Sequence, residues 1–225
     1  MTTSHAVEIA LPDVQLDGEW LIPSEPIAAI VLAHGAGAGF KHANMQAIAE
    51  HLAEQNIASM RFNFPYMQAG QRRTDRPEVA CAAIQAAYGV AQEGLVHQNL
   101  NIPLLAGGHS FGGRMTSLAT AQGMMDPAGL IFFSFPLHQP KKPDRKRAAH
   151  LPDISAPMLF LSGTRDDLAE HTLLTTVVDE LPRARIHWLE TGNHSYVILK
   201  RTRTNPMPIF EEIGLAARAF VDELI

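Results

Sequence analysis

Residues 104–113 read Leu104-Leu105-Ala106-Gly107-Gly108-His109-Ser110-Phe111-Gly112-Gly113. An apolar run comes first, the pattern G-x-S-x-G follows at Gly108, Ser110 and Gly112, and a segment with apolar residues at helical spacing comes next. A serine between a strand and a helix lies on a sharp, strained turn that exposes its hydroxyl, and glycines on either side let strand and helix pass closely. We therefore expect an exposed Ser110 hydroxyl and, at the start of a helix, a Phe111 N–H that can stabilise a negatively charged oxygen.

Short apolar runs rich in β-branched residues alternate with longer segments of helical period along most of the chain. An antiparallel hairpin is expected first, at residues 7–10 and 14–22. The alternation predicts one α/β domain over residues 1–225, with a mostly parallel, twisted sheet and helices on both faces. The expected strands are 27–33, 57–62, 102–107, 130–134, 157–162 and 185–190, and the expected helices are 44–55, 77–96, 112–122, 168–181 and 208–224.

Composition excludes several classes of protein. The chain of 225 residues has 46% hydrophobic and 18% charged positions, which excludes intrinsic disorder. Its net charge of −5 argues against a nucleic acid partner, since phosphate binding usually needs a basic excess. The single cysteine, Cys81, excludes an internal disulfide and suits a reducing compartment. The first residues do not resemble a secretory signal, and the longest apolar run is too short to cross a bilayer, so we expect a cytoplasmic protein without a membrane partner.

A serine hydroxyl needs a histidine base and an acid that orients the base. In folds with this strand–turn–helix motif, the chain order is serine, acid, histidine. His194 alone among the later histidines follows the last expected strand, in a turn sequence at the carboxyl edge of the sheet, where ligands bind in open α/β folds. The acid is expected just after strand 157–162, where Asp166 is the first choice and Asp167 the expected N-cap of the next helix; the two assignments could be exchanged.

A second oxyanion donor is expected in the loop after strand 27–33, which reads His34-Gly35-Ala36-Gly37-Ala38-Gly39. Small residues let backbone N–H groups approach a substrate oxygen, although a tight turn alone would also use glycine. We expect Ala36 to be the donor, together with Phe111. This chemistry needs neither a metal nor an organic cofactor.

These features in this order resemble the α/β-hydrolase superfamily, including its small dienelactone-hydrolase-like members. Further motifs are similar to those of a group of mostly uncharacterised bacterial hydrolases: Leu32 to Gly39, Arg61-Phe62-Asn63-Phe64-Pro65-Tyr66, Gly108 to Arg114, and Phe135-Pro136-Leu137-His138. The resemblance covers residues 27 to 220. Dienelactone hydrolases proper have cysteine in place of Ser110, so the resemblance does not carry over their substrate.

In the superfamily, a helical cap domain often follows the sixth strand. The corresponding segment here, 135–156, is too short for a full cap, so the resemblance implies a minimal core with an open site for small or exposed acyl groups. Tyr66, Met67, Phe135 and Leu137 are candidates to line the acyl pocket, with packing at the edge of the core as the alternative.

The sequence thus predicts a serine hydrolase that cleaves ester-type bonds of a small acyl substrate; thioester and amide cleavage use the same machinery. The alternative is a binding or scaffold protein that kept the fold and lost turnover. Basic side chains in the two long loops, among them Arg72, Arg73 and Arg76 and those near Lys141, are interpreted as solvated, with an anionic substrate as the second interpretation. The oligomeric state does not follow from the sequence.

Overall fold

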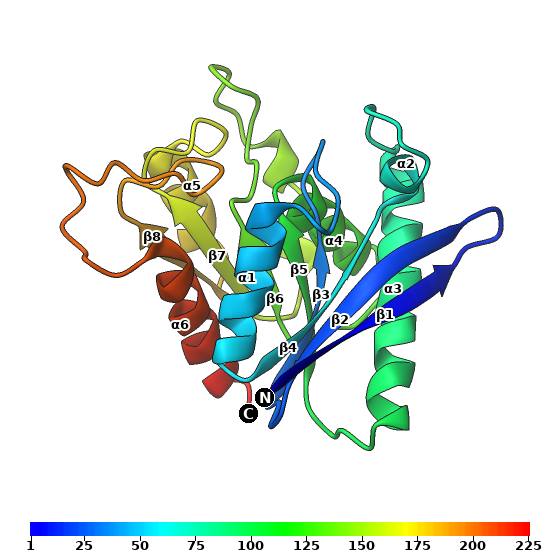
Figure 1. The fold of residues 1–225 in the computed structure, drawn as a ribbon. Helices are drawn as coiled ribbons and strands as arrows, with labels where there is room; N and C mark the ends of the chain where they lie inside the picture. The colour runs from blue at the N-terminus through cyan, green and yellow to red at the C-terminus, as the bar shows by residue number, and fades with distance from the viewer.

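The computed structural model describes all residues 1–225 and contains one eight-stranded sheet (Figure 1). The strands run side by side in the order β1-β2-β4-β3-β5-β6-β7-β8. β2 pairs antiparallel with β1 and β4, and all other neighbouring strands are parallel. The strands are β1 (Thr2–Ala10), β2 (Gln15–Pro23), β3 (Ala28–Ala33), β4 (Ile57–Phe62), β5 (Leu104–His109), β6 (Leu130–Phe133), β7 (Met158–Gly163) and β8 (Ala184–Leu189).

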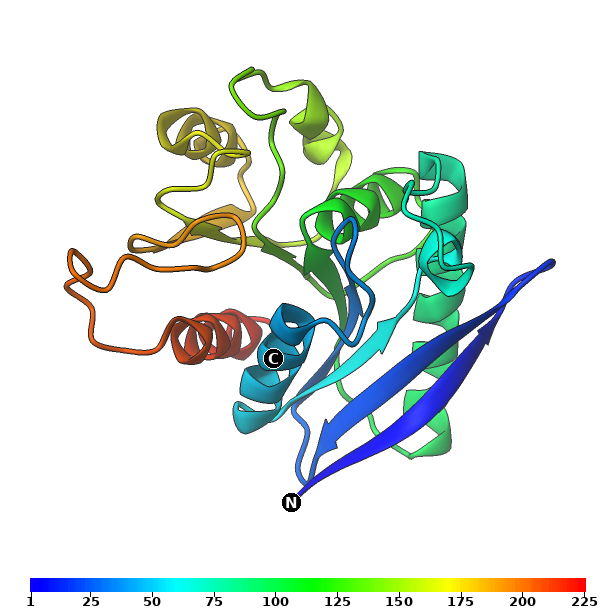
Figure 2. The same ribbon diagram turned by 45° about the horizontal axis from the view of Figure 1, so that its top comes forward.

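Helices cover both faces of the sheet (Figure 2). α1 and α6 pack against each other on one face, and α3, α4 and α5 contribute to the apolar cluster on the other face. The fold class that the sequence predicts is therefore confirmed. The helices are α1 (Ala43–Glu54), α2 (Pro65–Gln68), α3 (Pro77–His97), α4 (Phe111–Ala121), α5 (His171–Asp179) and α6 (Ile209–Asp222), with two 3₁₀ turns, η1 (Lys146–Ala148) and η2 (Leu151–Asp153).

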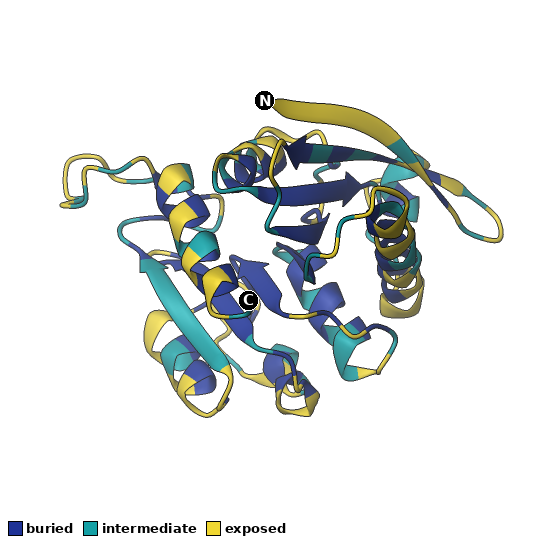
Figure 3. Ribbon diagram, turned by 90° about the horizontal axis from the view of Figure 1, so that it is seen from below, coloured by how far each residue is buried: buried dark blue, intermediate teal, exposed yellow.

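Burial follows the position of each strand in the sheet (Figure 3). β3, β4, β6 and β7 are buried along their whole length, because both faces of these strands are covered. Their sequences are mostly apolar, with Ser59 and Arg61 in β4 and Ser162 in β7 as buried polar residues. The edge strand β1, which begins at the label N in Figure 3, is mostly exposed, and β8 at the opposite edge is partly exposed. The apolar core therefore lies on both sides of the central strands.

Two boundaries differ from the sequence-based predictions in an informative way. β1 begins at Thr2 rather than near Val7, because its backbone pairs with β2 as far as Thr2 although residues 2–6 have few apolar side chains. The predicted start of a helix near Leu168, with Asp167 as its N-cap, is wrong. α5 begins at His171, and the carboxylate of Glu170 caps it by accepting from the N–H groups of Thr172 and Leu173.

The carboxyl edge of the parallel strands carries no cap domain. The segment between β6 and β7 contains only two 3₁₀ turns of three residues each, η1 and η2. This agrees with the predicted minimal core, and it leaves the carboxyl edge accessible.

α3 is a long helix of 21 residues with mostly apolar side chains. By length and composition alone it could cross a membrane, and 44% of its most apolar window is buried within the fold. Its buried side chains, among them Ala83, Ile84 and Ala87, belong to the cluster on one face of the sheet, which accounts for the apolar composition of the helix.

Candidate active site

Ser110 lies at the turn between β5 and α4, where its φ of 50° and ψ of −115° place it in a strained region of backbone space. Such strain costs on the order of 1–3 kcal/mol and is typical of functional sites. The turn depends on its glycines: a Cβ on Gly108 would lie 2.5 Å from the carbonyl oxygen of Ala33, and one on Gly112 would be closer still to the same atom. The predicted strand–turn–helix context of Ser110 is therefore present.

His194 and Asp166 meet Ser110 at the carboxyl edge of the sheet. The Nε2 atom of His194 lies 2.7 Å from the Oγ atom of Ser110, and its Nδ1 atom lies 2.8 Å from Oδ2 and 2.9 Å from Oδ1 of Asp166. His194 follows β8 and Asp166 follows β7, so three distant parts of the chain supply the three side chains. The Asp166 side chain is fully buried, whereas that of His194 is 17% exposed. This arrangement gives a serine hydroxyl, a proton acceptor and a buried carboxylate in one line.

The two neighbouring aspartates, Asp166 and Asp167, differ in their hydrogen bonds and in their exposure. Asp166 also accepts a hydrogen bond of 2.8 Å from the N–H of Leu168, which fixes its carboxylate in a tight turn after β7. Asp167 is exposed and makes no hydrogen bond or ion pair through its side chain. The geometry thus associates Asp166, and not Asp167, with His194.

His109, the residue before Ser110, holds the backbone of His194. Its Nε2 atom lies 3.0 Å from the carbonyl oxygen of His194, so this nitrogen carries the proton. Burial, reinforced by the nearby His194, lowers the pKa of His109 to about 4, and the ring is therefore neutral near pH 7. Sequence reasoning missed this role, because only the tertiary fold brings the two segments together.

In the glycine-rich loop after β3, two side chains form hydrogen bonds with the carbonyl oxygen of Gly35. The Nδ1 atom of His34 lies 2.8 Å from the carbonyl oxygen of Gly35, and the Tyr66 hydroxyl donates to the same oxygen at 3.3 Å. The Nε2 atom of His34 accepts from the N–H of Phe64 at 3.1 Å, so the ring is neutral with its proton on Nδ1. In a trans peptide the N–H points opposite to the carbonyl, so the N–H of Ala36 faces away from this cluster.

The N–H groups of Ala36 and Phe111 have no hydrogen-bond partner within the chain. Phe111 is the first residue of α4, where backbone N–H groups are left free by the helix. Ala36 and Ser110 line the same cavity. Two free donors thus lie on the segments that flank the Ser110 hydroxyl.

The cavity at Ser110 has a volume of about 330 Å³, and its lining combines small and apolar residues with histidine, serine and asparagine side chains. Its walls come from the glycine-rich loop, the start of α1 and the turns that carry Ser110, Asp166 and His194. None of the four residues predicted to line an acyl pocket is among them: Tyr66, Phe135 and Leu137 are buried in the core, and Met67 is half-buried beside Gly39. The lining residues are Gly35, Ala36, Gly37, Ala38, His42, Asn44, Met45, His109, Ser110, Leu168, His194 and Ser195.

His138 stabilises the turn that contains Asp166 through hydrogen bonds. Its backbone N–H donates to the carbonyl of Leu168 at 2.9 Å, and its Nε2 atom accepts from the N–H of Glu170 at the same distance. The ring is fully enclosed, and its Nδ1 atom lies 2.8 Å from the carbonyl of Gln139. The segment after β6 and the segment after β7 therefore support each other.

A second serine–histidine pair joins α4 to the residue before η2: the Oγ atom of Ser117 lies 2.7 Å from the Nε2 atom of His150. Ser117 is fully buried, and its hydroxyl donates to the carbonyl of Arg114 at 2.8 Å. The hydroxyl thus accepts the proton of the histidine instead of giving up its own. Its burial excludes a substrate, so this pair has a structural role.

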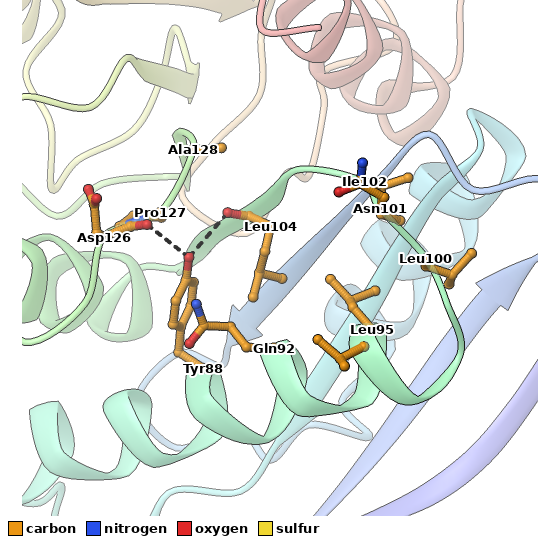
Figure 4. A pocket seen from close by; sticks show the side chains of 11 residues that line it. Tyr88, Gln92, Leu95, Leu100, Asn101, Ile102, Leu104, Asp126, Pro127 and Ala128 are labelled. Carbon is orange, nitrogen blue, oxygen red and sulfur yellow. Dashed lines mark hydrogen bonds between the residues drawn. The ribbon is translucent and has the colours of Figure 1, made fainter.

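A larger hollow of about 460 Å³ lies at the opposite edge of the sheet, between α3 and the start of β5 (Figure 4). The hydroxyl of Tyr88 reaches the carbonyl oxygens of Asp126 and Leu104 at 3.0 and 3.4 Å. Its other walls are mostly apolar and contain no serine, cysteine or histidine. Chemistry, and not size, therefore identifies the cavity at Ser110 as the candidate active site. No group of three or more metal-ligating side chains is found in the chain.

Comparisons with known proteins agree with this architecture. Residues 26–222 match the family described as the alpha/beta hydrolase domain, so the chain belongs to the α/β-hydrolase family. Among solved structures, it is similar to a dienelactone hydrolase from Anabaena variabilis, with a TM-score of 0.76, 18% sequence identity and 98% of each chain covered.

Two further structures have the same fold. One is an α/β serine hydrolase without a lid from Xanthomonas campestris, with a TM-score of 0.67 and 18% identity, covering 98% of this chain and 93% of that one. The other is Est1E from Butyrivibrio proteoclasticus, with a TM-score of 0.71 and 15% identity, covering 97% of this chain and 98% of that one. Identities this low establish the shared fold and not a shared substrate.

Proposed function

We propose that the protein is a serine hydrolase that cleaves ester-type bonds through an acyl-enzyme, with Ser110 as nucleophile, His194 as general base and acid, and Asp166 as the residue that orients His194. One observation carries this proposal: a single imidazole bridges the Ser110 hydroxyl at 2.7 Å and the Asp166 carboxylate at 2.8 Å. Both distances lie within the range for proton transfer and orientation.

The buried carboxylate determines which nitrogen of His194 reacts. Because Asp166 can only accept a hydrogen bond when ionised, it favours the tautomer with the proton on Nδ1. The lone pair on Nε2 then takes the proton of Ser110 as the Oγ atom attacks the substrate carbonyl. The imidazolium returns this proton to the leaving alcohol, and a water molecule activated by the same nitrogen releases the acid and restores Ser110.

The N–H groups of Ala36 and Phe111 are the proposed donors that stabilise the negatively charged oxygen of the tetrahedral intermediate. Both N–H groups lack a partner within the chain; Phe111 follows Ser110 directly, and Ala36 lines the same cavity as Ser110. Preorganised donors are effective because they need no reorganisation when the charge develops, and loss of one typically costs about 10²–10³-fold in kcat. In this scheme, His34 and Tyr66 hold the Gly35 peptide so that the Ala36 N–H keeps its direction.

The open carboxyl edge supports a small or exposed acyl substrate. The cavity of about 330 Å³ at Ser110 is the proposed substrate site, in place of the four residues expected from the sequence. One structural neighbour is described as a cold-adapted esterase and another as a dienelactone hydrolase, and both descriptions support ester bonds as the first substrates to test. The same machinery serves thioesters and amides.

The direct test is hydrolysis of three matched panels: p-nitrophenyl esters, acyl thioesters and aminoacyl amides. We expect turnover of at least one panel by the wild type and a loss of about 10³-fold or more in Ser110→Ala, since the residual rate comes only from binding and the oxyanion donors. Equal rates in both preparations would indicate a contaminating hydrolase. A folded wild type without turnover in any panel would favour the alternative of a binding or scaffold protein.

A further inference from the structure

Basic residues are concentrated at the edge of the sheet where Ser110 lies. We define the rim as the five segments that follow the carboxyl ends of parallel strands, at the upper edge in Figure 1. The rim comprises about a third of the chain yet holds 13 of the 18 Lys and Arg residues and only 7 of the 23 Asp and Glu residues. Its formal charge is therefore +6, while the rest of the protein carries −11. The rim consists of residues 34–42, 63–76, 134–153, 164–170 and 190–208.

Most of these cations have no carboxylate partner. Within the rim, only Arg145 and Arg203 form ion pairs, with Glu180 and Glu212. Nine others are exposed, and their side chains form neither an ion pair nor a hydrogen bond, whereas the exposed Arg165 donates to the carbonyl of Thr191. Since surface charges of both signs are usually interspersed, an unpaired set of one sign at one edge creates a directed field. The nine residues are Lys41, Arg72, Arg73, Arg76, Lys141, Lys142, Lys146, Lys200 and Arg201.

The acidic residues of the rim are mostly engaged in fixing its turns. Five of the seven accept hydrogen bonds from backbone N–H groups, including Asp166, which also holds His194. Hydrogen bonds of this kind compensate part of the negative charge locally. The five residues are Asp75, Asp144, Asp166, Glu170 and Glu190.

The cavity itself presents no carboxylate to an incoming group. Its polar walls consist of backbone N–H groups, the side chains of His42, Asn44 and Ser195, and the reacting residues, with Asp166 behind His194. The Asn44 amide donates to the carbonyl of Ser195 at 3.0 Å, which joins two walls of the cavity. A negatively charged substrate would thus meet a positive rim and no opposing charge at the entrance.

We propose that this hydrolase takes ester-type substrates that carry a negative charge, such as a carboxylate or phosphate on the acyl or leaving group. The inference rests on the proposed function and specifies its substrate class. Clefts surrounded by charge of one sign raise the local concentration of oppositely charged substrates, an effect that salt weakens because the Debye length shortens. The negative remainder of the surface repels long polyanions, which favours a small molecule as the ligand.

The test compares two esters of equal acyl length, mono-p-nitrophenyl glutarate with a terminal carboxylate and p-nitrophenyl valerate without one. We expect kcat/KM for the anionic ester to fall about fivefold or more between about 10 and 500 mM NaCl, while the value for the neutral ester changes less than about twofold. A comparison in ammonium acetate would exclude a specific chloride effect.

A pair of double variants locates the effect. Arg72→Gln/Arg73→Gln removes two unpaired charges from the rim segment 63–76. Gln92→Glu/Gln98→Glu makes the same change in net charge at exposed positions in α3 and directly after it, at the opposite edge. We expect the first variant to lower kcat/KM for the anionic ester about threefold or more and to leave the neutral ester unchanged. The control variant should leave both values within about twofold of the wild type.

Equal, salt-insensitive kcat/KM for the two esters would overturn the proposal while leaving the hydrolase function intact, because the neutral ester would still be turned over. Binding to phosphatidylglycerol vesicles or to DNA, without preference for the anionic ester, would assign the rim to a macromolecule and would also overturn it. Loss of turnover for both esters in the wild type would instead contradict the proposed function.

Discussion

The side chain of His109 donates a hydrogen bond of 3.0 Å to the backbone carbonyl of His194, so the residue next to the proposed nucleophile positions the proposed base. We predict that His109→Leu lowers kcat about tenfold with little change in KM, because the loss of one buried hydrogen bond costs about 1–2 kcal/mol and loosens the position of His194. Steady-state kinetics on a neutral ester measure this effect.

His109→Gln is the matched control, since its amide can still donate toward the His194 carbonyl. Partial recovery of kcat in this variant supports a positioning role. Because the pKa of His109 is about 4, the ratio of mutant to wild-type kcat should stay constant from about pH 6 to pH 9. A ratio that varies across this range would mean that His109 exchanges protons during the reaction.

Two single variants, Asp166→Asn and Asp167→Asn, test which of the two aspartates orients His194. The first variant should lose about 10³-fold or more in kcat, because an amide favours the wrong tautomer of His194. The second should retain kcat within about threefold, since the exposed Asp167 contacts no catalytic group. The opposite pattern would exchange the roles of the two residues.

Tyr66→Phe removes one of the two donors that hold the Gly35 carbonyl. We predict a loss of about fivefold in kcat at unchanged KM and weaker binding of a boronic acid, which mimics the tetrahedral intermediate, because the effect acts on the Ala36 N–H. A rise in KM alone would instead indicate that Tyr66 contacts the substrate, as first predicted from the sequence.

The buried His34 should make the stability of the protein depend on pH. Burial lowers its pKa to about 4, against about 6.5 for the unfolded chain, and protonation of Nε2 would also oppose the N–H of Phe64. Between these two values the unfolded state binds more protons than the folded state, so stability is lost as pH falls through this window. From pH 7 to pH 5, His34 should contribute a loss of about 2 kcal/mol in the free energy of unfolding.

Urea unfolding at the two pH values, in the wild type and in His34→Gln, measures this contribution. The variant should be less stable at pH 7 and should lose less stability than the wild type on acidification. Should both proteins lose the same amount, other groups would be responsible for the acid sensitivity. An NMR titration of the His34 ring provides an independent check, since its resonances should not move above about pH 5.

Much of the fold could be predicted from the sequence because strand and helix periods differ clearly and strands such as β3 are continuous apolar runs. The meeting of Ser110, Asp166 and His194 was also predictable, since each follows a strand and the carboxyl ends of parallel strands share one edge. The start of α5 was not, because Asp167 belongs to the residue types preferred at a helix N-cap, whereas the cap in the structure is Glu170, whose type is not among them.

The lining of the cavity was beyond prediction for a different reason. Apolar residues near a site look the same whether they face substrate or core, and the structure buries Tyr66, Phe135 and Leu137. The supporting roles of His34 and His138 depend on contacts between segments far apart in the chain. A histidine in a glycine-rich loop or after a strand is the signal that could have drawn attention to them.

The central claim is that Ser110 is a nucleophile activated by His194. Treatment of the folded protein with a fluorophosphonate probe, followed by mass spectrometry of the peptides, tests it most directly. We expect one adduct, on Ser110, that is absent in Ser110→Ala and strongly reduced in His194→Ala. A folded wild type that stays unlabelled, or that carries its adduct on another residue, would show that Ser110 is not an activated nucleophile.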